Sequence, residues 1–153
     1  MAKKLITAGQ IIQLTGISGD LDENNLNPCI KLAQDLQLSR ILGASLYGKI
    51  EQDYPTYSGV YTTIYNDYVL PILAFWSVAY QVKMNFATIN DSGNSKKTVE
   101  GATALDRSDN ISLEKDYVEC ANSYELKFVE FTKVNVIPEL QTDKPQTNTQ
   151  TFY

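Results

Sequence analysis

The stretch "VYTTIYNDYVLPILAFWSVAYQVKM", residues 60–84, decides the fold of this chain. Its centre, from Val69 to Val82, is apolar nearly all round, which is typical of a helix that other helices surround. At about 14 residues, and with Pro71 inside it, this centre is shorter than the roughly 20 residues that cross a bilayer. We therefore predict a central core helix. Its largest members form the expected hub of a bundle: Leu73, Phe75, Trp76, Val78 and Tyr80.

Pro71 sets a second expectation for this helix. Proline has no amide hydrogen, so it cannot donate the helical hydrogen bond to the carbonyl of Asp67. We expect a kink or a short break near Tyr68.

A short helix is expected close to the N-terminus. Thr7 followed by Gln10 fits a capping box, in which each side chain bonds the backbone of the other residue. Apolar residues follow, and Gly16 is placed to end the helix.

A second helix follows the turn "GISGD". Its apolar residues recur at spacings of three and four, the period of an amphipathic helix: Leu26, Cys29, Ile30, Ala33 and Leu36. Proline is tolerated in the first turn of a helix, so Pro28 predicts a start near Asn24 or Asn25.

Small residues interrupt the next stretch, "SRILGASLYGKI", residues 39–50. Leu46 and Ile50 share one helical face, whereas Ala44 and Gly48 share roughly the opposite one. A helical glycine costs about 1 kcal/mol relative to alanine, a cost that a closely approaching helix would explain. We expect two contact faces here, with a packed core on one side and a sister helix or a neighbouring protomer on the other. The alternative is that Gly43 ends a helical turn and that Gly48 is incidental.

A long polar connection is predicted after the core helix, from Ile89 to Asn110. Structureless connections of this length are uncommon in compact domains, and they tend to be functional or disordered. The piece "KKTVE", residues 96–100, favours a short strand in a projecting hairpin, with a plain mobile loop as the alternative.

The last helix is expected to resume near Ser112 and to end before Pro138. Its apolar stripe is the clearest in the chain: Leu113, Tyr117, Cys120, Tyr124, Phe128 and Phe131. We predict one helical domain over residues 1–141, with residues 89–110 as its arm. Residues 142–153 form an extended C-terminal tail that is too polar to fold alone, and we expect Phe152 and Tyr153 to anchor it on another surface.

The composition excludes several kinds of chemistry. The chain has 153 residues and no histidine, so it lacks histidine-dependent nucleophiles and histidine metal ligands. Neither of the two common glycine-rich phosphate-binding motifs occurs. Cys29 and Cys120 are far apart in the sequence, and we interpret both as small apolar core residues. We expect a protein that is not an enzyme, with no cofactor and no metal.

Two alternatives remain at this point. The segment "ITAGQIIQLTGISGDLDENNL", residues 6–26, resembles a helix-turn-helix of a DNA-binding regulator. However, the turn is followed by acidic residues with no Lys or Arg before Lys31, and the net charge is −5, so this surface would repel DNA. The other alternative is a hydrolase that uses carboxylates such as Asp20, Asp22 and Glu23, although acidic turns are mostly solvated surface.

Two stretches carry a resemblance to a known class. They are "IKLAQDLQLSRILGASLYGKI", residues 30–50, and "DYVLPILAFW", residues 67–76, followed by a polar insertion and a final helix. Over approximately residues 5–140 the chain resembles small helical head-to-tail connector proteins of tailed bacteriophages. The likeness is closest to those of phages infecting Bacteroidota, including crAss-like phages.

The resemblance implies a structural virion protein, made in the host cytoplasm and located in the neck. It implies a dodecameric ring below the portal, in contact with the portal protein and with adjacent neck or tail rings. Duplex DNA would pass through without sequence-specific binding, and no membrane is involved; the N-terminus lacks the features of a signal peptide. A tail-completion or stopper protein is the alternative within this class. The expected protein-interaction residues are Ala44, Gly48, Lys96, Lys97, Thr98, Val99, Phe152 and Tyr153.

Overall fold

The fold is taken from a computed structural model, which describes residues 3–17, 23–91 and 102–141. Side chains are described for all of these except residues 23, 85–91 and 102–110. Within these limits every regular element is helical, as predicted for a mainly α bundle. The helices are α1 (Ala8–Thr15), α2 (Glu23–Leu32), η1 (Ala33–Leu38), α3 (Ser39–Asp53), α4 (Val60–Thr63), η2 (Ile64–Val69), α5 (Leu70–Asp91) and α7 (Ala102–Val134).

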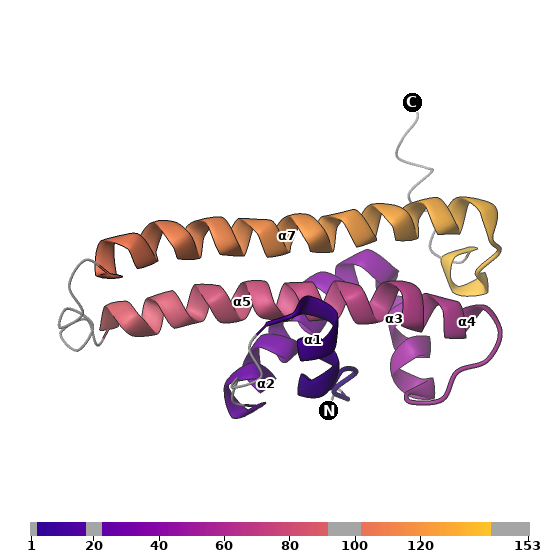
Figure 1. Ribbon diagram of the computed structural model, residues 1–153. Helices are drawn as coiled ribbons and strands as arrows, with labels where there is room; N and C mark the ends of the chain where they lie inside the picture. The colour runs from indigo at the N-terminus through magenta and orange to yellow at the C-terminus, as the bar shows by residue number, and fades with distance from the viewer. Residues whose placement is uncertain (1–2, 18–22, 92–101, 142–153) are drawn as a thin grey trace.

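Two long helices, α5 and α7, define the shape of the molecule. They lie side by side along most of their length and run in opposite directions, and α1 and α2 lie on the side of α5 away from α7 (Figure 1). The ends of α5 and α7 nearest to residues 92–101 extend past the shorter helices as a helical hairpin (Figure 1). The protein is therefore a compact helical body with a projecting two-helix arm.

The core lies between α5 and the shorter helices. Apolar residues from almost every element are fully buried there, and they include Leu26, Leu46, Ile64, Val69, Ile72, Leu73 and Val78. The predicted hub is confirmed at Leu73 and Val78, whereas Phe75, Trp76 and Tyr80 are only partly buried and pack at the edge of the core. The stretch that decided the fold is thus the central element of the bundle.

The two predictions from proline have different outcomes. The helix does not break near Tyr68, but residues 64–69 form the π-helical segment η2, an irregularity of the kind that accompanies helix kinks, and α5 continues directly from it through Pro71. A π-helical turn changes the hydrogen-bonding pattern just where the proline amide is missing. Pro28 lies inside α2, which begins at Glu23, so it sits further into the helix than the first turn.

The N-terminal predictions hold. Thr7 and Gln10 form the predicted capping box, and Gly16 ends α1 in the left-handed conformation at φ 73°. Gly43 also has a positive φ, 81°, with ψ 160°, and it interrupts α3. The alternative in which Gly43 ends a helical turn is therefore confirmed.

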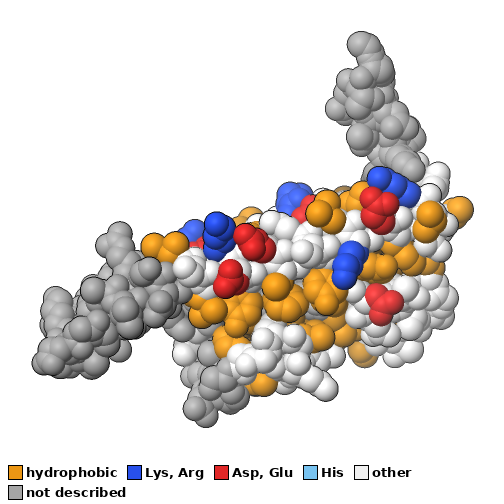
Figure 2. All heavy atoms as spheres, turned by 45° about the horizontal axis from the view of Figure 1, so that its top comes forward, with side chains coloured by type: hydrophobic (Ala, Val, Ile, Leu, Met, Phe, Trp, Pro, Cys, Tyr) orange, Lys and Arg blue, Asp and Glu red, His pale blue; other side chains and the backbone are white. Residues whose placement is uncertain are grey.

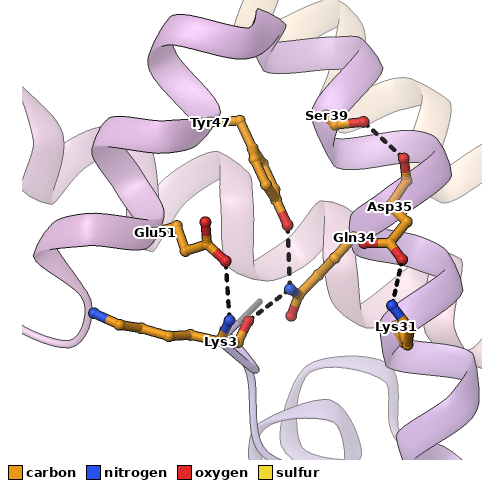
Figure 3. Close-up of polar contacts among 7 residues, drawn as sticks. All are labelled: Lys3, Lys31, Gln34, Asp35, Ser39, Tyr47 and Glu51. Atoms are coloured by element: carbon orange, nitrogen blue, oxygen red, sulfur yellow. Dashed lines mark hydrogen bonds and ion pairs between the residues drawn. The ribbon is translucent and has the colours of Figure 1, made fainter. Parts of the chain in front are cut away.

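An extended segment, residues 3–6, is fixed across the body by side chains that bond its backbone. The side-chain oxygen of Gln34 accepts from the Leu5 amide at 2.7 Å, and its nitrogen donates to the Lys3 carbonyl at 2.7 Å. In Figure 3 the Gln34 side chain lies between the Lys3 backbone and the Tyr47 hydroxyl. Tyr65 donates its hydroxyl to the Leu5 carbonyl at 2.6 Å. Leu5 and Ile6 are fully buried, so this segment is part of the core.

The predicted arm is mostly helix. Residues 89–91 belong to α5 and residues 102–110 to α7, so the prediction of a polar connection over Ile89–Asn110 is wrong at both ends. The last helix begins ten residues before Ser112, at Ala102. It ends at Val134, before Pro138 as predicted, and residues 138–141 add a helical turn. The strand predicted at residues 96–100 and the tail after residue 141 lie outside the described residues.

Candidate protein-interaction surface

The predicted interaction residues fall into two groups. Ala44 and Gly48 lie on α3, and both are exposed. No atom lies within 4 Å of the position that a Cβ at Gly48 would occupy, so no helix of the described chain packs closely there. The expected close contact within the chain is therefore wrong, and this face of α3 is open. The other six lie outside the described residues: Lys96, Lys97, Thr98, Val99, Phe152 and Tyr153.

Aromatic rings line one edge of the junction between α5 and α7. Phe75 stacks on Tyr124 with ring centroids 5.9 Å apart and planes 15° apart, and it contacts Tyr117 at 6.2 Å. Tyr68 contacts Phe131 at 5.1 Å. None of these five rings is fully buried. Aromatic pairs of this kind contribute about 0.5–1.5 kcal/mol beyond their buried area, and half-exposed aromatic residues are enriched in protein interfaces.

The side of α7 that carries these rings has a heptad pattern. Seven residues recur at alternating spacings of four and three, and six of them are apolar or aromatic: Leu113, Tyr117, Cys120, Tyr124, Lys127, Phe131 and Val134. We call them the heptad stripe. Leu113 is 42% exposed and Val134 is 81% exposed, so neither end of the stripe is covered. A stripe with this spacing is the pattern that pairs one helix with another.

The sequence prediction for this helix was right about the period and partly wrong about which residues are buried. Ala121 and Phe128 are buried against the body, whereas Leu113 and Cys120 are exposed. The interpretation of both cysteines as core residues is confirmed for Cys29 and wrong for Cys120.

A second apolar surface lies on the outer side of α7. Ile111 is 56% exposed, Leu126 is 67% exposed and Val129 is 40% exposed. We call Leu126 and Val129 the outer apolar cluster, because Ile111 lies 15 residues, about 22 Å, further along the helix. Leu126 and Val129 are three residues apart and therefore neighbours on the helix surface. In Figure 2 hydrophobic side chains also gather in a band along the line where α7 lies over α5. Isolated exposed apolar residues are ordinary, but grouped ones indicate interaction sites.

The position of α7 is fixed by polar bonds at two places. Both guanidinium nitrogens of Arg40 bond the carboxylate of Glu125, at 2.9 and 3.2 Å, and so tie α7 to the start of α3. Near the end of the helix Tyr61 donates its hydroxyl to Glu139 at 2.7 Å, and Ile137 is buried beside it. Burial, followed by this bond to Glu139, raises the pKa of Tyr61 to about 12. The side of α7 that carries the stripe is thus held in a defined orientation.

Few of the described side chains are arranged as metal ligands or as reactive groups. Among them, no three His, Cys, Asp or Glu residues come together as a metal site. Burial raises the pKa of the Cys29 thiol to about 11, and the thiol donates to the side-chain oxygen of Gln81 at 3.2 Å, so at neutral pH it is a protonated core group. No helix among the described residues has the length and apolar character of a membrane span.

From the sequence alone the heptad stripe is interpreted as the buried face of the helix, because apolar residues at this spacing are typical of a core. The signal for a partly exposed face was present: Lys127 falls on the same spacing, which is unusual for a buried position. The outer apolar cluster gave no such signal, because two apolar residues three positions apart are too few to define a helix face.

Over the residues described, the protein is therefore all-helical. Its long helix α7 packs on the body with one side and carries apolar surfaces on its other sides. The family of the protein follows from comparison: residues 38–148 match a family of unknown function, DUF6712, and the chain belongs to that family. No curated protein and no solved structure shows a significant match to the chain.

Proposed function

We propose that this protein is a structural subunit of a tailed-bacteriophage virion, a head-to-tail connector that forms a ring below the portal. The proposal starts from the resemblance of residues 30–50 and 67–76 to such connectors. In the ring, copies of the chain contact one another, the portal protein and the adjacent neck or tail rings. A tail-completion or stopper ring in the same neck is the alternative position.

One observation supports this proposal more than any other: α7 is packed on one side only, and its outer apolar cluster stays exposed. A subunit of a cyclic ring needs two different contact surfaces, because its neighbours on the two sides are not equivalent. The outer apolar cluster on α7 and the open face at Ala44 and Gly48 on α3 are two such surfaces on different elements.

The charge of the chain fits a passage for DNA. Its net charge is −5, and residues 89–153 hold 7 basic and 11 acidic side chains. An acidic wall repels the duplex, so DNA would slide past with little adhesion. The same charge also favours solubility, so it supports the proposal without deciding it.

The decisive experiment is imaging of the native particle. Cryo-electron microscopy of virions that carry this protein should show a ring next to the portal into which the α5–α7 pair fits. Absence of the protein from purified virions by mass spectrometry would overturn the proposal. A ring further down the neck would favour the stopper alternative.

A matched pair of variants tests the supporting observation. Val129 and Leu14 are equally exposed, at 40% each, but Leu14 lies on α1, away from the outer apolar cluster. Val129→Asp should reduce incorporation into particles by roughly tenfold, because it places an unpaired carboxylate in an apolar contact. Leu14→Asp should leave it unchanged, and both variants should fold normally. Equal incorporation of both variants would remove this support.

The remaining class, a DNA-binding regulator, is tested separately. Salt-dependent binding of duplex DNA by the purified chain at physiological ionic strength would favour the regulator over the connector.

A further inference from the structure

The heptad stripe on α7 is only partly covered in the described chain. Its three ring residues, Tyr117, Tyr124 and Phe131, pack against rings of α5 and η2. The other four members are exposed: Leu113, Cys120, Lys127 and Val134. Six of the seven positions of the stripe are apolar or aromatic, over 22 residues of straight helix, counted from Leu113 to Val134. A second α-helix can cover the exposed members of the stripe together with the free edges of its rings.

The charges at the stripe favour an antiparallel over a parallel arrangement of two α7 helices. Lys127 is the only charged member, and its ammonium lies over the ring of Tyr124 at 5.2 Å from the centroid. Asp116 is exposed and lies beside Tyr117, about three turns of helix away from Lys127. In a parallel pair of α7 helices, Lys127 would face its own copy, and the two like charges would repel. In an antiparallel pair centred on residue 122, Lys127 faces Tyr117 and Asp116 of the partner subunit.

We propose that in the free protein α7 pairs with α7 of a second copy, antiparallel and along the heptad stripe. Residue 120 then lies opposite the partner's residue 124, and Leu113 lies opposite the partner's Phe131. Two equivalent pairs join Lys127 of each copy to Asp116 of the other, as two-fold symmetry requires. Phe75 and Tyr68 lie at the edge of the contact, since their rings already touch the stripe residues.

This dimer goes beyond the connector proposal and does not depend on it. It concerns the free chain, and it uses a different side of α7 from the outer apolar cluster. A virion ring could be found with or without a dimer in solution, and a dimer could exist in a protein that never enters a virion. The two proposals therefore fail independently.

Sedimentation analysis of charge variants tests the register. The unmodified chain should sediment as a dimer at tens of micromolar. Lys127→Glu should weaken dimerisation by roughly tenfold or more, because two attractive pairs become repulsive. The double variant Asp116→Lys with Lys127→Glu should restore it. Lys115→Glu is the matched control: it makes the same charge change at an exposed α7 position off the stripe, and dimerisation should stay within about twofold of that of the unmodified chain.

Cross-linking provides a second, independent readout. Cys29→Ala leaves Cys120 as the only thiol, and in the proposed pair the two Cys120 positions are offset by four residues, about 6 Å along the helix. A short bis-maleimide should link two chains at Cys120. It should not do so when the only cysteine is moved to the outer apolar cluster, as in Cys29→Ala, Cys120→Ser and Leu126→Cys combined.

Three results would overturn the dimer. They are a monomer at 100 micromolar or above, equal effects of Lys127→Glu and Lys115→Glu, or failure of the double variant to restore association while its circular dichroism spectrum stays native. Cross-linking through residue 126 instead of residue 120 would place the contact on the outer side of α7 and also contradict the proposal.

Discussion

The side-chain amide of Gln34 bonds the backbone on both sides of Lys4, a residue 30 positions away in sequence: its oxygen accepts from the Leu5 amide and its nitrogen donates to the Lys3 carbonyl, each at 2.7 Å. Gln34 is only 2% exposed, so water cannot replace either bond. Together with the Tyr65 hydroxyl, which donates to the Leu5 carbonyl, this side chain holds residues 3–6 against the core.

Replacing Gln34 should destabilise the protein strongly. Gln34→Ala leaves the buried Leu5 amide without an acceptor, and the expected loss in the free energy of unfolding is about 2–4 kcal/mol. Urea denaturation followed by circular dichroism measures it. Gln52→Ala is the control: Gln52 is exposed and bonds Lys3 through its backbone carbonyl, so its loss should stay below about 0.5 kcal/mol. Similar losses in both variants would show that the clamp on residues 3–6 is not important for stability.

Truncation to alanine should cost much more stability at one residue of α7 than at another residue two positions away. Phe128 is 2% exposed and its ring lies 5.7 Å from that of Tyr68, so Phe128→Ala should cost about 3–5 kcal/mol. Leu126, two residues away, is 67% exposed, so Leu126→Ala should change stability by less than about 0.5 kcal/mol. Thermal or urea unfolding of the two variants compares them directly. A small effect at Phe128 would mean that α7 is not packed on the body as described.

The two glycines of α3 should also behave differently. Gly48 is helical with open space around it, so Gly48→Ala should stabilise the protein by about 0.5–1 kcal/mol. Gly43 has φ 81° and ψ 160°, a conformation that is essentially limited to glycine, so Gly43→Ala should destabilise it by about 1–3 kcal/mol. Chemical denaturation gives both values. A destabilising Gly48→Ala would instead support the close helix contact that the sequence suggested.

Stability should fall at alkaline pH, partly because of Cys29. Its thiol pKa is raised by burial from 9.0 to about 11, so the folded chain keeps a proton that the unfolded chain loses. The contribution is complete below pH 9 and disappears as pH rises from 9 to 11, a loss of roughly 3 kcal/mol at about 1.4 kcal/mol per pKa unit.

Urea denaturation at pH 8, 9, 10 and 11 tests this pH dependence. Burial also raises the pKa values of Tyr57 and Tyr65, so the whole protein loses more stability than one thiol explains. Cys29→Ala should therefore make the decline shallower without removing it. Cys120→Ala, at an exposed thiol, should leave the decline unchanged. Identical pH profiles for all three proteins would contradict the assignment to Cys29.

Much of the fold could be predicted because apolar spacing reports buried helix faces. The core helix, the capping box at Thr7 and the end of α1 at Gly16 all follow from local rules, and all are present. The start of α7 could not be found in this way. Residues 102–110 are mostly polar, so apolar spacing gives no signal there, although polar residues can extend a helix that begins beside another one.

The candidate surfaces were harder to predict than the fold. A stripe such as Leu113, Tyr117 and Cys120 has the same spacing whether the body or a second chain covers it, and only the position of α5 decides which side is buried. The role of Gln34 was equally hidden, because a polar residue that bonds distant backbone has no characteristic spacing. Both depend on contacts between segments far apart in the chain.

The packing of α7 along α5 makes the projecting hairpin a stiff beam. The 33 residues of α7 extend for about 50 Å, and the helix is tied to the body by Arg40 and Glu125 and, beyond its C-terminal end, by the bond between Tyr61 and Glu139. Because α5 continues into the core, a load applied at the far end of the hairpin is carried along both helices to the body.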